Sequence, residues 1–159
     1  MIYKNYGVFK LPTLLTFLFI LPFQLWASYD IKNAYPDPEL KPNEVVRLQL
    51  LAMQQNEESN FGIEVTFRFA SPANKRQTGP LKRFVMLVRS PSYSPLLNHT
   101  NATFLELTIE DNFAIQDVVI TTSEGKRIGY RFRLSIQKGN VYPECWMTDS
   151  VIPFKLIEV

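Results

Sequence analysis

The apolar residues in the two halves of the chain follow different spacings. Between residues 43 and 56 they recur every three or four positions, at Val45, Leu48, Leu51 and Ala52. That spacing places them on one face of an α-helix. Pro42 precedes them, and proline is common at the first position of a helix. We therefore predict a helix from Pro42 to about Asn56, buried on most of one side.

From Ala102 onward the apolar residues alternate with polar ones, as they do in half-buried β-strands. The alternation predicts four strands, over residues 102–109, 113–122, 128–136 and 141–152. Turn residues separate the strands, and Gly125 can adopt the positive φ that a tight hairpin needs. Three successive reversals of the chain predict an antiparallel meander.

The third predicted strand has the most regular pattern of the four. Its large apolar residues share one face, at Ile128, Tyr130, Phe132, Leu134 and Ile136. The other face carries three arginines, Arg127, Arg131 and Arg133. Because successive side chains of a strand point to opposite faces, we expect the apolar row to face a core and the arginines to face water.

The segment between the two halves is ambiguous. Apolar and polar residues alternate from Ile63 to Phe69, which by periodicity alone indicates a strand. The segment Ser71–Asn74 contains a proline, and we expect it to break whatever element precedes it. Beyond it, Thr78 is the predicted N-cap of a helix that has Pro80 in its first turn.

Three phrases of the sequence resemble the family known as domain of unknown function 4864. They are Phe69–Asn74 (FASPAN), Thr78–Leu81 (TGPL) and Cys145–Asp149 (CWMTD). The resemblance extends over residues 45–152. It implies that the ambiguous segment from Ile63 to Phe69 is a second helix.

Helices followed by an antiparallel sheet form the element order of an α+β fold. We predict N-terminal helices packed on a curved four-stranded antiparallel sheet. This order is similar to that of the cystatin-like, cone-shaped fold of nuclear transport factor two, the ketosteroid isomerases and the polyketide cyclases. That likeness implies a pocket at the wide end of the curled sheet.

The N-terminal segment has the pattern of a secretory signal peptide. Lys4 and Lys10 precede an apolar run from Leu11 to Trp26, and Ala27 follows it. We predict cleavage after Ala27 and an exported chain, periplasmic or secreted. Its residues 28–42 would then be an extended lead-in, and residues 43–159 a single α+β domain. The alternative is an uncleaved membrane anchor, although the run spans only about 16 residues and a bilayer needs about 20.

Charge and cysteine content exclude several classes of function. The chain has 17 Lys and Arg against 15 Asp and Glu, and two of the lysines lie in the predicted signal peptide. A nearly neutral processed chain would not attract nucleic acid through its overall field. Cys145 is the one cysteine and His99 the one histidine, which excludes a disulfide framework and Cys- or His-rich metal sites. We expect no metal and no cofactor.

Two carboxylates in the predicted sheet are candidate catalytic groups. Asp117 alternates in phase with Ile115 and Val119. If that face points inward, burial would raise the pKa of its carboxyl and allow it to act as a base. The alternative is that Asp117 pairs with an arginine of the neighbouring strand. Asp149, in the fourth strand, could orient a ligand or have a purely structural role.

Two aromatic residues, Tyr130 and Trp146, could line a pocket or simply be part of the core. Cys145 could be a nucleophile, but nothing in the sequence places a base beside it, so we expect a small buried residue. Asn98 and Asn101 both begin the acceptor pattern for N-glycosylation. The pattern alone leaves open whether either is modified.

These observations support three hypotheses about function. The first is an exported, non-catalytic module that binds a small apolar ligand or a protein. The second is a cone-fold isomerase, dehydratase or cyclase that uses Asp117 or Asp149 as a base in a dry pocket. The third is a homodimer formed through the sheet. In each case contact with a membrane would be limited to an uncleaved N-terminal segment.

Overall fold

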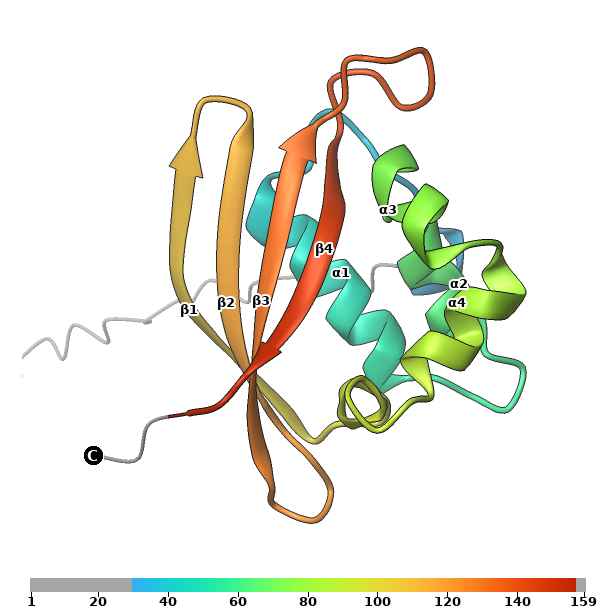
Figure 1. Cartoon of the computed structure of the whole chain (residues 1–159), viewed down its shortest axis with the longest axis vertical. Coiled ribbons are helices and arrows are strands. Elements are labelled where there is room, and N and C mark those ends of the chain that lie inside the picture. Colours follow the sequence, from blue (N-terminus) through green and yellow to red (C-terminus); the bar gives the residue numbers. More distant parts are fainter. Residues whose placement is uncertain (1–29, 157–159) are drawn as a thin grey trace, which may run out of the picture.

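In the computed structural model, which describes residues 30–156, four α-helices precede a four-stranded antiparallel sheet and pack against one side of it (Figure 1). The helices are α1 (Pro42–Gln54), α2 (Phe61–Arg68), α3 (Pro72–Thr78) and α4 (Leu81–Val88). The strands are β1 (Asn101–Glu110), β2 (Phe113–Thr121), β3 (Arg127–Ile136) and β4 (Trp146–Phe154). Two 3-10 turns, η1 (Ile31–Asn33) and η2 (Ser94–Leu96), complete the described elements. The α+β prediction is confirmed, whereas the predicted signal peptide, residues 1–27, lies outside the described residues.

Helix α1 is the central element of the helical layer. Glu44 accepts a hydrogen bond from the backbone N–H of Lys41 at 2.8 Å, which caps the start of the helix. The buried surface of α1 includes most of the predicted stripe and the flanking positions Val46, Leu50 and Met53. The additional burial arises because α1 lies between the sheet on one side and α2 on the other.

The ambiguous segment is a helix, α2, as the family resemblance implies. Gly62 allows α2 to approach α1 closely, because a Cβ at this position would overlap the backbone carbonyl of Ala52. Ile63 and Val65 are fully buried. On the outer side, Arg68 forms a salt bridge with Glu64 at 3.0 Å, one helical turn away. Packing against α1 therefore outweighs the alternating pattern that indicates a strand.

The element before Ser71–Asn74 ends at Arg68, as the predicted break requires, but these residues begin a helix, α3, that the sequence analysis does not predict. The Ser71 hydroxyl accepts from the backbone N–H of Asn74 at 3.2 Å, and Pro72 is the first helical residue. Thr78 ends α3 instead of capping the next helix. Gly79, with a φ of 82°, separates the two helices, and Pro80 is the N-cap residue of α4.

The sheet has the predicted meander order, β1-β2-β3-β4. In β3, Tyr130, Phe132 and Leu134 are buried against the helices, while the three arginines are exposed on the opposite face. The fourth strand begins at Trp146, later than predicted. The preceding residues form a loop because Tyr142 and Glu144 adopt positive φ angles, 53° and 61°, which a strand does not accommodate.

Strand β4 contains a bulge that matters for the site. Arg133 of β3 pairs with Ser150 and Leu134 pairs with Thr148, so Asp149 is an extra residue with no opposite partner. On its other edge, β4 contacts the connection between α2 and α3. Thr148 donates its N–H to the carbonyl of Phe69, and Ser71 donates to the carbonyl of Thr148, both at 2.9 Å.

Candidate functional site

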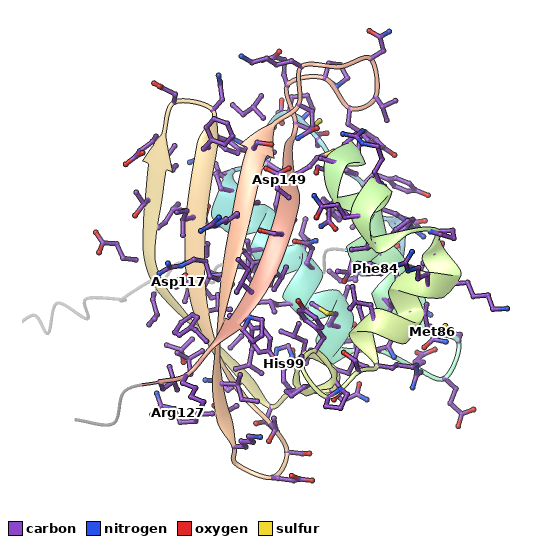
Figure 2. The ribbon with its side chains drawn as sticks, viewed as in Figure 1. Phe84, Met86, His99, Asp117, Arg127 and Asp149 are labelled. Carbon is purple, nitrogen blue, oxygen red and sulfur yellow. The ribbon has the colours of Figure 1, made fainter. Side chains whose placement is uncertain are left out.

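A cavity of about 170 Å³ lies between the helical layer and strands β3 and β4. Its apolar walls come from α1, α4, η2, β3 and β4, through Met53, Phe84, Leu87, Val88, Leu96, Phe132 and Val151. Its polar wall includes Gln49, Thr66, Asn74, Thr148 and Asp149. Figure 2 shows Asp149 on β4 and Phe84 on the side of α4 that faces the sheet. The cavity therefore combines a large apolar surface with a short row of polar groups.

The polar wall is held by hydrogen bonds that link α1, α2, α3 and β4. Thr148 Oγ1 donates to Gln49 Oε1 at 2.7 Å, and Gln49 Nε2 donates to the carbonyl of Thr66 at 3.2 Å. Asn74 Nδ2 donates to the carbonyl of Thr148 at 3.0 Å. These groups are almost fully buried, so each bond fixes the position of its partner.

Asp149 differs from the rest of the polar wall. The bulge in β4 gives it an irregular position between two residues that point to opposite faces of the sheet. Thr148 faces the helices, and Ser150 pairs with Arg133, whose side chain lies on the open face. Bulges commonly redirect a side chain next to a binding site. Within residues 30–156 the Asp149 carboxylate makes no hydrogen bond and no salt bridge, although the residue is half-buried and lines the cavity.

Asp117, the other candidate carboxylate, lies on the opposite face of the sheet. Arg131 Nε donates to Asp117 Oδ1 at 2.8 Å, and Arg131 Nη2 donates to Oδ2 at 2.7 Å. The hydrogen bond to Asp117 and its negative charge raise the pKa of the Arg131 guanidinium. The residues that face the helices in β2 are instead Ala114, Gln116, Val118 and Ile120. Asp117 is thus an ion-pair partner outside the cavity.

Neither of the two candidate aromatic residues lines the cavity. Tyr130 is fully buried, and its hydroxyl donates to the carbonyl of Ser92 at 2.9 Å. Burial, with a smaller contribution from Tyr93, raises the pKa of Tyr130 to about 12. Trp146 is partly buried and packs against the core. Both residues therefore pack in or against the core. Of the four candidate residues, only Asp149 lines the cavity.

The sequence analysis missed Gln49, Thr66, Asn74 and Thr148. A usable signal exists for Gln49, because it lies between Leu48 and Leu50 in a helix buried on both of these sides. A polar residue within a buried stripe needs a partner inside the protein. No such signal marks Asn74, because its helix was not predicted.

The remaining titratable candidates are buried and lie outside the cavity lining. Burial raises the pKa of the Cys145 thiol, with smaller effects from Asp37 and Glu144, which disfavours the nucleophilic thiolate. Burial lowers the pKa of His99, whose Nδ1 lies 2.8 Å from the carbonyl of Leu96. Among residues 30–156, no three His, Cys, Asp or Glu side chains are grouped so that they could hold a metal ion. The helices of this same range are too short or too polar to span a bilayer.

Comparison with known proteins identifies the family. No curated protein matches the chain, and no solved structure does. The family model described as "Domain of unknown function (DUF4864)" matches residues 37–152. This range is well over half of the chain and includes the cavity-lining residues of the helices and of β4. The chain therefore belongs to the DUF4864 family.

Proposed function

We propose that the protein is a non-catalytic binding module that takes a small, mostly apolar ligand in the cavity between the helices and β4. The observation that supports this proposal is the cavity itself, about 170 Å³ with largely apolar walls. An apolar cavity of about 150 Å³ is large enough to bind benzene. The ligand is therefore expected to be about the size of one substituted aromatic ring.

The polar wall supports the view that the cavity selects a ligand and is not merely a defect in packing. The buried side chains of this wall already have partners within the protein, since among residues 30–156 no buried side-chain nitrogen or oxygen lacks a hydrogen bond. A ligand would therefore gain most of its affinity from apolar contact. Its orientation would depend on the few lining groups that still have acceptor capacity, above all Asp149.

A substitution that fills the cavity tests this proposal directly. Leu87 of α4 lines the cavity, whereas the adjacent Met86 is 68% exposed. Leu87→Trp is expected to abolish the binding of single-ring compounds, measured by NMR titration. Met86→Trp, which introduces the same residue on the exposed side of the same helix, is expected to leave binding intact. If no single-ring compound shifts any resonance of the folded wild-type protein, the proposal is wrong.

A catalytic role is the second candidate, and the position of Asp149 favours it over Asp117. A carboxylate without an internal partner, facing a cavity with apolar walls, could remove a proton from a bound carbonyl compound. This is the chemistry expected from the likeness to the cone-shaped fold. Incubation with small ketones in D₂O would reveal Asp149-dependent exchange of α-protons. The binding-module proposal instead expects the same exchange rate with and without the protein.

Self-association through the face of the sheet that carries Arg131 is a third candidate. Phe113 and Ile152 lie on this face and are 64% and 43% exposed. Apolar side chains between charged ones are suited to a two-fold interface. Light scattering is expected to give twice the mass of the chain, and Phe113→Glu is expected to restore the single mass.

We also propose that the protein is exported after cleavage of residues 1–27. The positively charged start, the apolar run and Ala27 support this proposal. N-terminal sequencing of the protein recovered from the cell envelope or the medium is expected to begin at Ser28. A protein that begins at Met1 in the membrane fraction would instead support the anchored alternative.

A further inference from the structure

The side chains that line the cavity carry one charge. Asp149 is the single acidic residue among them, and none of them is basic. The other ionisable lining residue is Tyr93, whose hydroxyl donates to the carbonyl of Val151 at 3.1 Å. The electrostatic potential in the cavity therefore depends mainly on Asp149, and it favours a positive group over a negative one.

Basic residues lie on elements next to this part of β4, and none of them pairs with Asp149 within residues 30–156. Arg133 of β3, opposite Ser150 in the ladder, is exposed on the open face. Lys75, the lysine of α3, donates to the carbonyl of Arg68 at 3.2 Å, and its Nζ lies 5.1 Å from the centre of the Phe67 ring. Burial also lowers the pKa of Lys75. On the far face of the sheet, by contrast, Asp117 already has an arginine in two-point contact. Among the residues that line the cavity, Asp149 therefore keeps a carboxylate that can accept a donor from a ligand.

The bulge in β4 gives this carboxylate a fixed place relative to the apolar walls. Thr148, the residue before it, is held through its backbone by Phe69 and Ser71 and through its side chain by Gln49. Its neighbour Ser150 is held by the ladder to Arg133. A charged acceptor on a constrained backbone, next to an apolar cavity, matches a ligand with a compact apolar body and a charged donor at one end.

We propose that the cavity binds a primary or secondary amine whose body is about the size of one aromatic ring, with the ammonium group on the Asp149 carboxylate. This inference rests on the proposed binding function and specifies its ligand class. Carboxylates and phosphates of the same size are disfavoured by the charge of Asp149 and the lack of any basic lining residue.

Three probes of equal size separate this inference from the binding function itself. Benzylamine, benzyl alcohol and benzoate differ in charge at neutral pH but share one ring. With the protein purified from an exporting host, benzylamine is expected to bind at least about tenfold more tightly than benzyl alcohol, as measured by calorimetry or NMR titration. Benzoate is expected to bind more weakly than benzyl alcohol.

The matched variants Asp149→Asn and Asp117→Asn attribute the preference to a residue. Asp149→Asn is expected to make the affinities for benzylamine and benzyl alcohol equal, while Asp117→Asn keeps the wild-type ratio. Asp149→Glu, which keeps the charge, is expected to retain a preference for the amine. Equal affinities in the wild-type protein, or an unchanged preference in Asp149→Asn, would overturn this inference and leave the binding function standing. Failure of all three probes to bind would overturn both.

Discussion

The two faces of the sheet treat the same kinds of residue in opposite ways. On the helix-covered face, β3 contributes Tyr130 and Phe132, which are fully buried. The neighbouring cavity is lined in part by Asp149, whose carboxylate has no partner within residues 30–156. On the open face, β3 contributes three arginines, and one of them binds Asp117. The carboxylate of Asp117 on the open face is thus neutralised within the sheet, whereas the carboxylate of Asp149 beside the cavity has no such partner within residues 30–156.

This difference indicates which face of the sheet contributes most to the free energy of unfolding. Large apolar side chains on the covered face stabilise the fold because their surface is removed from water. The open face keeps Phe113 64% exposed, so its side chain contributes little to folding. Paired substitutions, one on each side of the sheet, can therefore break or sharpen the comparison.

Truncation of an aromatic residue should show the largest contrast. Phe132→Ala on the covered face is expected to lower the free energy of unfolding by about 3–5 kcal/mol, because it enlarges a space within the core. Phe113→Ala on the open face is expected to change it by less than about 0.5 kcal/mol. Urea denaturation of both variants measures the contrast, and similar losses would mean that the open face is covered in solution.

Crowding within the helical layer should have the next largest effect. Gly62→Ala would place a Cβ against the backbone carbonyl of Ala52. We expect a net loss of about 1–3 kcal/mol despite the better helix propensity of alanine. Gly139→Ala is the control, because a Cβ there would meet no atom within 4 Å. A thermal midpoint for Gly62→Ala at or above that of the wild type would contradict the close contact of α1 and α2.

Removal of one hydroxyl from the polar wall should have an effect of similar size. Thr148→Val keeps the shape of the side chain but leaves Gln49 Oε1 without its 2.7 Å donor. A buried acceptor without a partner costs about 1–3 kcal/mol. Thr108→Val, on the exposed edge strand β1, is the control and is expected to be neutral. Equal stability of the two variants in chemical denaturation would show that Gln49 finds another donor.

Protonation of the buried His99 should make the free energy of unfolding depend on pH. The pKa of His99 in the folded protein is lowered below its ordinary value of 6.5. The unfolded chain therefore takes up a proton at a higher pH than the folded one, and the free energy of unfolding falls as the pH drops below about 6.5. His99→Gln is expected to flatten this slope between pH 7 and pH 5 in denaturation series. The same slope in both proteins would assign it to other groups.

The ion pair on the open face should contribute least. Arg131 is 46% exposed at its side chain, so solvent screens its attraction to Asp117. Asp117→Asn is expected to unfold at nearly the same urea concentration as the wild type, and added salt is expected to reduce any difference further. A loss of unfolding free energy as large as that of Thr148→Val would show that the ion pair is shielded from solvent more than its exposed fraction indicates.

The order of elements and the buried face of β3 could be predicted from the sequence, because period-two alternation fixes which side chains share a face. Helix α3 could not, since Ser71 and Pro72 are both chain-breaking residues and helix-starting ones. The strand-like alternation in α2 was misleading for a related reason. Packing against α1 selects the helical conformation, and the sequence of one segment does not show which other element will pack against it.

The candidate site was less predictable than the fold. Asp149 was a candidate, but alternation alone groups it with Cys145 and Met147. Its place beside the cavity depends on one unpaired residue in the β4 ladder, and the sequence does not mark that bulge. The residues that hold Thr148 come from α1, α3 and the connection between α2 and α3, so their convergence is a property of the tertiary structure.

The contact between β4 and the α2–α3 connection also limits how copies of this chain can join. With Phe69 and Ser71 hydrogen-bonded to Thr148, and Tyr93 bonded to the Val151 carbonyl, part of the outer edge of β4 has no groups left for a foreign strand. The β1 edge lacks such a cover among the described residues. The covered part of β4 is thus protected against the addition of a foreign strand, whereas β1 relies on its charged and polar side chains for that protection.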